Sequence, residues 1–253
     1  MSEQIGPVLA ATAATEAETV RKSSSTSLVA ELESVRWVQQ EVREGRALPV
    51  VETVTVVASL HIGMRPEGRL SLPLLRVDDM NDYLAVHALN VSMLSMALSE
   101  YVDFDTEATR KIGAAALLHD IGMTRMPVDL IAKPGQISAG ERDRIKEHPV
   151  EGARIIMAAD PSLELAATVA YEHHLKVDGS GYPKLTYPRP GHYVSRLVQL
   201  CDIYHALRSP RPFRQPWPRE IIYSFLNERA GFEFHPALAA ALTRMTQQLD
   251  PIG

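Results

Sequence analysis

The chain has 253 residues, enough for one large domain or for a main domain with a small appendage, and either arrangement can bury a substantial core. Its formal net charge of -5 argues against binding to polynucleotides or to anionic membranes, although a local cationic pocket for a small phosphate ligand remains compatible with it. A single cysteine, Cys201, excludes an internal disulfide, and its apolar surroundings indicate a small core residue.

The N-terminal part of the chain is predicted to hold a lead segment followed by helices. Residues 1–26 are rich in Ala, Thr, Ser and Glu without apolar periodicity, which predicts a disordered lead. They lack a basic start followed by an apolar stretch, and no run in the chain is long enough to span a membrane, so we expect a cytoplasmic protein. Apolar residues at helical spacing predict helices over 27–46 and 50–62, which we assign to a small N-terminal helical subdomain over 27–68.

Helix signals continue through the rest of the chain. Asp78 or Asp79 is expected to cap a helix over 80–101, and Asp105 or Thr106 opens the next, which runs to about residue 119. After a break at 133–135, a capping-box pattern of Ser138 and Glu141 predicts a single helix to about residue 158. Further helices are predicted over 162–174, 191–207, 217–230 and 235–249, with proline-rich segments between them. With no convincing strand pairs and no internal repeat, the predicted fold class is all-α.

Histidines and aspartates fall on the apolar faces of five of these helices. His87 shares a face with Val91 and Leu94, and Asp202 follows Val194 and Val198 at steps of four residues. The same periodicity holds for the other members, so all of them are predicted to point inward. The set is His87, His119, Asp120, His148, His173, His174 and Asp202.

The two aspartates decide how this set is interpreted. A lone histidine on an apolar face is usually a hydrogen-bonded core residue, because histidine is intermediate in its preference for burial. A carboxylate is almost never buried without a partner, since desolvating it costs several kcal/mol or more. No Lys or Arg accompanies Asp120 or Asp202 at helical spacing on the same face. A pair of divalent cations would supply the missing charge and would use the imidazoles as ligands.

The types of ligand narrow the choice of metal. Imidazole and carboxylate without thiolate suit Fe, Mn, Ni, Co or Zn. One tetrahedral ion would leave several of the seven candidates unused, whereas two ions about 3.5–4 Å apart with a bridging carboxylate would use all of them. Such a pair creates a hydroxide from water and holds phosphate oxygens during attack, so the sequence predicts phosphoester hydrolysis at a binuclear centre.

The order of the motifs around these residues resembles the HD-GYP branch of the HD-domain metal-dependent phosphohydrolases. The motifs are LLHDIGM, EHPVEGARII, HHLKVDGSGYP and RLVQLCDIYHAL, and the likeness covers roughly residues 70–237. It implies an HD-domain helical bundle over 69–253, a binuclear iron or manganese site, and hydrolysis of the bacterial second messenger cyclic di-GMP to the linear dinucleotide or to GMP. Tyr83 stands where members with a third metal have glutamate, so no third ion is expected.

The resemblance also implies roles for individual residues. One ion would be held by His87, His119, Asp120 and Asp202, and the other by Asp120, His148, His173 and His174. Asp120 would bridge the two ions and would form the catalytic pair with His119. The substrate-binding candidates are Arg211 and Arg214 in RSPRPFR, Lys133 in AKPGQIS, and Tyr182 in the loop over 178–183. Without the resemblance, ordinary solvated charge explains the two arginines equally well.

Four departures from the family pattern keep alternatives open. Met123 replaces a lysine that supports the scissile phosphate, and a thioether donates no hydrogen bond. Leu175, Val177 and His205 replace a glutamate, a tryptophan and an aspartate. The leading hypothesis is a phosphodiesterase acting on cyclic di-GMP or a related cyclic dinucleotide.

Two other functions compete with this hypothesis. The first is a catalytically weakened module that binds metal or nucleotide and signals through protein contacts, for example with a diguanylate cyclase through the Tyr182 loop. The second is hydrolysis of another phosphorylated metabolite. The N-terminal helices could form a homodimer contact or be a sensory remnant.

Overall fold

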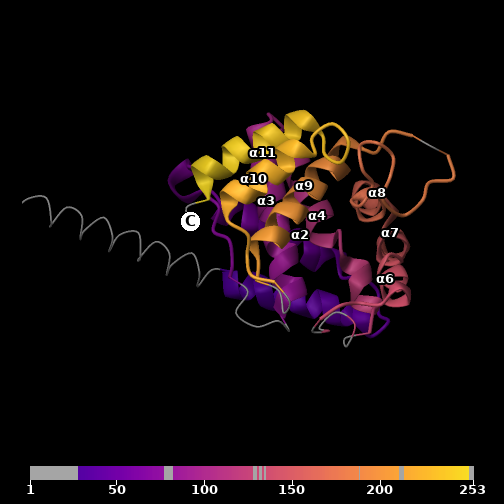
Figure 1. Ribbon diagram of the computed structural model, residues 1–253. Coiled ribbons are helices and arrows are strands. Elements are labelled where there is room, and N and C mark those ends of the chain that lie inside the picture. The colour runs from indigo at the N-terminus through magenta and orange to yellow at the C-terminus, as the bar shows by residue number, and fades with distance from the viewer. Residues whose placement is uncertain are drawn as a thin grey trace, which may run out of the picture.

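The computed structural model describes residues 28–76, 82–127, 130, 133, 135–187, 189–210 and 214–250. The predicted disordered lead and the proposed capping residues Asp78 and Asp79 lie outside these ranges. A helix over 28–43 comes first. The α-helices that follow are α2 (Val50–Gly63), α3 (Tyr83–Tyr101), α4 (Thr106–Leu118), α6 (Ala139–Ile145), α7 (His148–Ala159), α8 (Glu164–Glu172), α9 (Tyr193–Arg208), α10 (Arg219–Glu228) and α11 (Pro236–Leu249) (Figure 1). Short 3-10 helices η1 (Pro66–Gly68), η3 (Ile121–Arg125) and η4 (Pro161–Leu163) lie between them.

The predicted all-α class is confirmed. The described residues form no strand, and the isolated bridges with both residues described are Leu175 with Gly181 and Ala230 with Phe234. No helix in these ranges is both long enough and apolar enough to cross a membrane.

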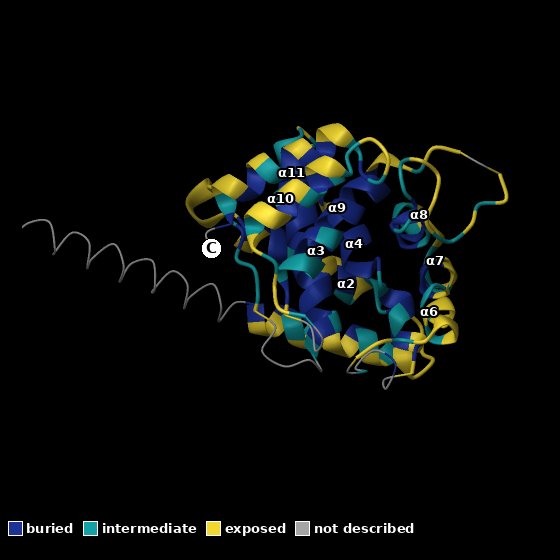
Figure 2. Ribbon diagram, viewed as in Figure 1, coloured by how far each residue is buried: buried dark blue, intermediate teal, exposed yellow. Residues whose placement is uncertain are grey.

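Helix α3 is the central element of the bundle. Almost every one of its side chains is buried, including polar ones such as Asn90 and Ser92. The sequence predicts a single inward stripe on this helix, whereas small and apolar residues around its whole circumference let neighbours pack on all sides. Helices α3, α4 and α9 lie at the centre, with α10 and α11 on one side and α6, α7 and α8 on another (Figure 1). The central three are mostly buried, while α6, α10 and α11 expose one face (Figure 2).

The helix ends follow from local hydrogen bonding. Asp105 caps α4 as predicted, accepting a hydrogen bond of 2.8 Å from the backbone N–H of Ala108. The capping box of Ser138 and Glu141 is also present at the start of α6. At α3 the residue before the helix is Asp82, and its side chain makes no capping hydrogen bond.

The predicted single helix from Ser138 to residue 158 is wrong, because it is two helices. Helix α6 ends at Ile145 and α7 begins at His148. Pro149 explains the break, since it has no N–H to donate and its ring would collide with the carbonyl of Ile145, four residues earlier. The freed carbonyl of Ile145 instead accepts a hydrogen bond of 2.7 Å from Nδ1 of His148. The same proline therefore ends one helix and leaves a carbonyl to orient a candidate ligand.

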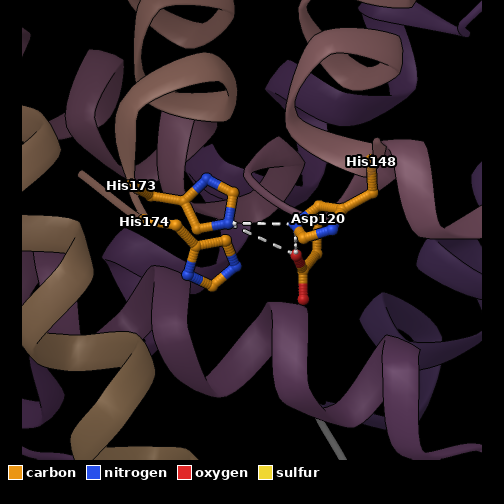
Figure 3. A group of neighbouring side chains, drawn as sticks. All are labelled: Asp120, His148, His173 and His174. Atoms are coloured by element: carbon orange, nitrogen blue, oxygen red, sulfur yellow. Dashed lines mark hydrogen bonds and ion pairs between the residues drawn. The ribbon is translucent and has the colours of Figure 1, made fainter. Parts of the chain in front are cut away.

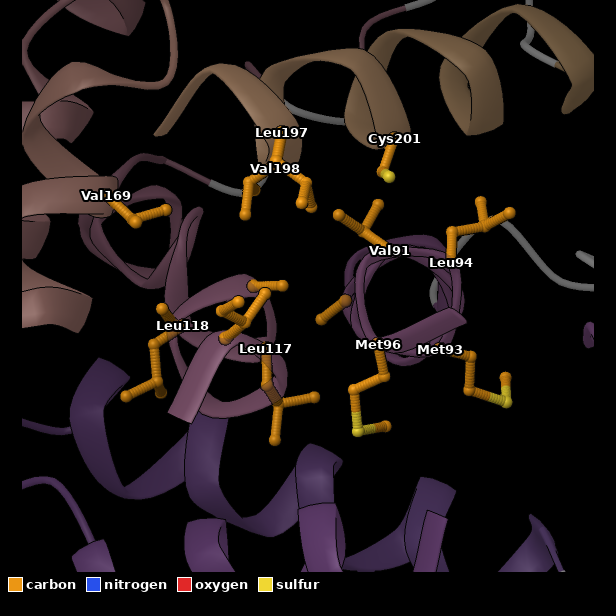
Figure 4. Close-up of a cluster of buried hydrophobic side chains, with 14 of the residues drawn as sticks. Val91, Met93, Leu94, Met96, Leu117, Leu118, Val169, Leu197, Val198 and Cys201 are labelled. Atoms are coloured by element: carbon orange, nitrogen blue, oxygen red, sulfur yellow. The ribbon is translucent and has the colours of Figure 1, made fainter. Parts of the chain in front are cut away.

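One continuous hydrophobic core joins the helices. Val91, Leu118, Val169 and Leu197 come from four different helices and belong to the same buried cluster (Figure 4). Cys201 lies in this core, fully buried and unpaired, as predicted. Side chains of the N-terminal helices, among them Val38, Val56 and Leu60, belong to the same cluster. The boundary between residues 27–68 and the rest stays a prediction.

Candidate metal centre

The seven predicted ligands lie together where five helices meet. His87 comes from α3, His119 and Asp120 follow α4, His148 begins α7, His173 and His174 follow α8, and Asp202 comes from α9. They form two groups, one of Asp120, His148, His173 and His174 and one of His87, His119 and Asp202, and the ligand atoms within each group lie within 4.8 Å of one another. We call these the Asp120 group and the His87 group.

The carboxylate of Asp120 faces both groups with different oxygen atoms. Its Oδ1 lies 3.1 Å from Nε2 of His148 and 3.5 Å from Nε2 of His173. Its Oδ2 lies 3.5 Å from Nε2 of His119 and 3.8 Å from Nε2 of His87. Figure 3 shows Asp120 opposite the pair of adjacent histidines, with His148 beside it. The two oxygens of one carboxylate therefore face the two ligand groups separately.

Backbone carbonyls orient three of the imidazoles. Nδ1 of His119 lies 2.7 Å from the carbonyl of Ala116, and Nδ1 of His173 lies 2.9 Å from that of Ala170. His148 makes the equivalent bond to Ile145. In each case Nδ1–H donates to the carbonyl, which leaves the lone pair of the neutral ring on Nε2 and aims it into the centre.

The donor set fits divalent metal ions. Nε2 of His119 is buried and has no hydrogen-bond partner in the described part of the chain. Leaving a buried polar atom without a hydrogen-bond partner costs about 1–3 kcal/mol, so we expect a metal ion or another group to bind this nitrogen. The charged partners that the structure gives Asp120 are histidines, none of them a lysine or arginine within the described ranges. Imidazole nitrogens and carboxylate oxygens are ligands for Fe, Mn and Zn.

The protonation states also suit metal binding. Burial raises the pKa of Asp120, but the surrounding imidazoles of His119, His148 and His173 outweigh it and hold the pKa well below its usual range. Burial lowers the pKa of His173 and His174, which favours the neutral imidazole that binds metal. At His148, Asp120 outweighs burial and raises the pKa.

Two glycines permit close packing around the ligands. A Cβ on Gly122, two residues after Asp120, would lie 2.1 Å from the carbonyl oxygen of His148. A Cβ on Gly181 would lie 2.1 Å from the carbonyl oxygen of His174, and Gly181 has a φ of +100°. The HDIGM segment and the GYP loop can therefore approach the ligands only with glycine at these positions.

The centre lies in a cleft of about 860 Å³. Members of both ligand groups line it, together with Tyr182, whose ring centroid lies 4.5 Å from that of His174. Met123 lines it as well. This volume is typical of a site for a small organic ligand.

The predicted substrate contacts are distributed unevenly around the cleft. Lys133 lines it, but its ammonium group donates to both carboxylate oxygens of Glu141, at 2.7 and 2.8 Å. This pairing helps lower the pKa of Glu141 to about 2. Arg214 donates to the carbonyls of Ala206 at 2.7 Å and Leu207 at 3.1 Å. It therefore caps the C-terminal end of α9 and does not line the cleft. Arg211 lies outside the described residues.

Sequence analysis missed three residues around the centre. Arg142 lines the cleft, and the clue was its position three residues before Ile145, which lines the cleft too. His205 was noted as a departure from the family pattern, yet its Nδ1 lies 2.7 Å from Nδ1 of His87. Asn90 donates to the other ring nitrogen of His205, and its place three residues after His87 puts both on one face of α3.

Comparison with known proteins agrees with this geometry. Residues 73–248 match the HD domain. The chain belongs to the HD domain family. It is 28% identical over 178 residues to a cyclic di-GMP phosphodiesterase of Pseudomonas aeruginosa, covering 70% of this chain and 43% of that protein. It is 30% identical to the cyclic di-GMP phosphodiesterase response regulator RpfG of Xanthomonas campestris, covering 64% and 43%.

Two further relatives widen the comparison. A 3'3'-cGAMP-specific phosphodiesterase of Vibrio cholerae is 29% identical, with 62% of this chain and 30% of that protein covered. A solved HDG"Y"P protein of Bdellovibrio bacteriovorus has the same fold, with a TM-score of 0.70 at 17% identity over 90% of this HD domain chain and 72% of that one. The resemblance to the HD-GYP branch is thus confirmed. The chain spans less than half the length of the three curated relatives named above.

Proposed function

We propose that this HD domain is a metal-dependent phosphodiesterase that hydrolyses cyclic di-GMP or a related cyclic dinucleotide. The observation that carries the proposal is the Asp120 carboxylate, which presents one oxygen to each of two groups of buried or half-buried ligands at a cleft of about 860 Å³. The relatives are named as cyclic di-GMP and 3'3'-cGAMP phosphodiesterases, which supports this class of substrate.

The two ligand groups would hold two ions of iron or manganese. His87, His119 and Asp202 would hold one ion, and His148, His173 and His174 the other, with Asp120 shared between them. When bound, a pair of divalent ions activates water and stabilises the charge of a phosphoryl group during in-line attack. The low pKa of Asp120 keeps its carboxylate ionised, as a shared ligand must be.

Other residues of the cleft would bind and orient the nucleotide. Arg142 is exposed on α6 and lines the cleft, where a guanidinium can donate to a phosphate oxygen. Tyr182 places an aromatic ring at the wall of the cleft, where a nucleobase would stack. Lys133 would reach a phosphate only by leaving Glu141.

The test is turnover by the purified chain loaded anaerobically with Fe(II) or Mn(II). We expect hydrolysis of cyclic di-GMP, 3'3'-cGAMP or both, and we expect Asp120→Ala to abolish it. Asp143→Ala is the matched control, because Asp143 is an exposed carboxylate on α6 that pairs with Lys146 and does not line the cleft. No hydrolysis of any cyclic dinucleotide, under conditions in which a known phosphodiesterase works, contradicts the proposal.

A second candidate is a module that binds cyclic dinucleotides without efficient hydrolysis. It is favoured by Met123, a side chain without hydrogen-bond donors on the cleft wall, and by the engagement of Lys133 with Glu141. Loss of one preorganised donor typically costs about 10²- to 10³-fold in rate. Calorimetry that detects nucleotide binding by a metal-loaded protein without turnover supports this candidate, and the loop carrying Tyr182 is then the proposed contact for a diguanylate cyclase.

A further inference from the structure

His87 differs from three other ligand histidines in the partner of its Nδ1 atom. His119, His148 and His173 each direct Nδ1 to a backbone carbonyl, which can only accept. Nδ1 of His87 instead lies 2.7 Å from Nδ1 of His205 and 3.4 Å from the hydroxyl of Tyr83, and both imidazole rings are buried. In a hydrogen bond between two neutral imidazoles, one nitrogen carries the proton and the other accepts it. The direction of this bond therefore decides which nitrogen of His87 is available to an ion.

Asn90 sets that direction. The backbone N–H of Leu75 donates to Oδ1 of Asn90 at 2.9 Å, and Nδ2 of Asn90 donates to the carbonyl of Leu75 at 2.8 Å. These two bonds fix which end of the amide is nitrogen. The same Nδ2 lies 2.8 Å from Nε2 of His205, and since an amide nitrogen can only donate, that ring nitrogen accepts. The hydroxyl of Ser209, 3.1 Å from the same Nε2, can donate to it as well. A neutral His205 then carries its proton on Nδ1 and donates it toward His87.

The consequence appears at the opposite nitrogen of His87. If Nδ1 of His87 accepts, its ring proton is on Nε2, which lies 3.1 Å from Oδ1 of Asp202 and donates to it. A protonated Nε2 has no lone pair for a metal ion, so an ion entering the His87 group must first displace this proton. Nε2 of His148 also lies 3.1 Å from a carboxylate oxygen, but in neutral His148 and neutral His173 the backbone carbonyl holds the ring proton on Nδ1 and leaves Nε2 free for an ion.

We propose that His205, oriented by Asn90, is a positioning residue that holds His87 in the tautomer unable to bind a metal ion, so that the His87 group binds its ion more weakly than the Asp120 group. This inference rests on the proposed two-ion centre. It distinguishes the two ions, which the proposed function treats alike. Changes around a ligand commonly alter metal affinity by about 10- to 100-fold, and we expect a difference of that size between the two sites.

Calorimetry of Mn(II) binding to the full chain tests the difference in affinity. The wild type is expected to bind one ion tightly and a second ion at least about tenfold more weakly. His174→Ala, which removes a ligand of the Asp120 group, should lower the affinity for the ion that binds tightly in the wild type. Two ions of equal affinity in the wild type overturn the inference. If no ion binds at all, the proposed two-ion centre itself fails, which is a different result.

Two variants at residue 205 test the assignment to His205. His205→Asn and His205→Asp each place an acceptor oxygen where Nδ1 of His205 lies, so that His87 can donate from Nδ1 and free its Nε2. Both variants should raise the affinity for the second ion by about tenfold, and misfolding cannot produce such a gain. The neutral asparagine shows that added charge is not the cause. His61→Asn, a buried histidine that pairs with Glu100 outside the centre, should change neither affinity. An unchanged or weakened second ion in both variants contradicts the proposal.

A direct measurement needs no metal. Nitrogen-15 NMR of the imidazole rings in the metal-free protein, at mildly alkaline pH, reports the tautomer of each histidine. We expect His87 to carry its proton on Nε2 and His148 and His173 to carry theirs on Nδ1. A proton on Nδ1 of His87 in the metal-free protein overturns the inference.

Discussion

The ionised state of Asp120 depends on its histidine neighbours. Its two oxygens lie within 3.1–3.8 Å of four imidazoles, and these overcome the cost of burial. Such an arrangement holds only while the imidazoles share a proton or a metal ion among them, because a buried carboxylate without positive charge is costly. This makes the carboxylate the most sensitive single position in the centre.

Replacement of Asp120 by asparagine should therefore remove both ions. The amide has nearly the same shape but carries no charge and offers a single oxygen, so it cannot serve both ligand groups. We expect the manganese content of protein loaded with Mn(II) to fall from about two ions per chain to less than one, measured by elemental analysis after dialysis. Asp143→Asn should keep the wild-type content. An Asp120→Asn protein that retains two ions would contradict the shared role of this carboxylate.

Arg142 and Arg144 provide a matched pair on one helix. Both are exposed on α6, but Arg142 lines the metal cleft, whereas Arg144 lines only an adjoining depression that shares Leu130 and Lys133 with the cleft. Arg142→Ala should raise KM for a cyclic dinucleotide about tenfold or more, because a hydrogen bond to a charged group contributes about 1.5–3 kcal/mol. Arg144→Ala should leave KM near the wild-type value in the same steady-state assay. Equal effects of the two substitutions would indicate general electrostatic attraction by α6 and no specific contact.

At the scale of elements, the position of α7 depends on one glycine before it. The segment of η3 (Ile121–Arg125) passes so close to the start of α7 that a Cβ on Gly122 would meet the carbonyl of His148 at 2.1 Å and the N–H nitrogen of Gly152 at 2.7 Å. Backbone atoms cannot yield as a flexible side chain can. Any side chain at residue 122 must push η3 and α7 apart and move His148 away from Asp120.

Gly122→Ala should consequently lower both stability and metal affinity. We expect the free energy of unfolding to fall by about 1–3 kcal/mol in urea denaturation, the usual cost of overpacking. The affinity of the Asp120 group for Mn(II) should fall with it. The control is Gly140→Ala in α6, where a Cβ would have no atom within 4 Å and where alanine should stabilise the helix by about 0.5–1 kcal/mol. Wild-type metal affinity in Gly122→Ala would show that the close contact does not position His148.

The helices and the inward histidines could be predicted because both follow from local periodicity. The capping box at Ser138 and the cap at Asp105 were also predictable, since each lies within a few residues of the groups that it satisfies. The break between α6 and α7 was missed, although Pro149 stood in the sequence, because the apolar pattern continues through it. A proline inside a helical pattern indicates that the helix ends about one turn before it, as α6 does at Ile145.

The assignment of the cationic residues was harder to predict, because long charged side chains choose their partners in three dimensions. Lys133 pairs with Glu141, eight residues away, and Arg214 turns back to the carbonyls at the end of α9. Arg142 looks like any exposed charge in the sequence. Asn90 and His205 are separated by 115 residues, so no local pattern could reveal their hydrogen bond.

At the scale of the whole molecule, the candidate centre joins segments from residue 87 to residue 202. Five helices each contribute at least one ligand, and the ligand atoms of each group converge within 4.8 Å. The unfolded chain cannot hold these ligands together, so an ion that binds them stabilises the folded state alone. Metal binding should therefore be visible in the stability of the entire fold.

Removal of metal ions should lower the melting temperature, and their return should raise it, more steeply once both ions bind. An ion at 100 times its Kd stabilises the folded state by about 2.7 kcal/mol. For a chain of this size each kcal/mol shifts the Tm by about 2–4 °C, so each ion should contribute roughly 5–10 °C. Because the Asp120 group is expected to bind more tightly than the His87 group, calorimetric scans of chelator-treated protein should show Tm rising with the logarithm of Mn(II) concentration, with a steeper slope once the second ion binds. Asp120→Asn should show no rise, and in His205→Asn the steeper slope should begin at lower concentration. A Tm that does not respond to Mn(II) would contradict a centre that ties the five helices together.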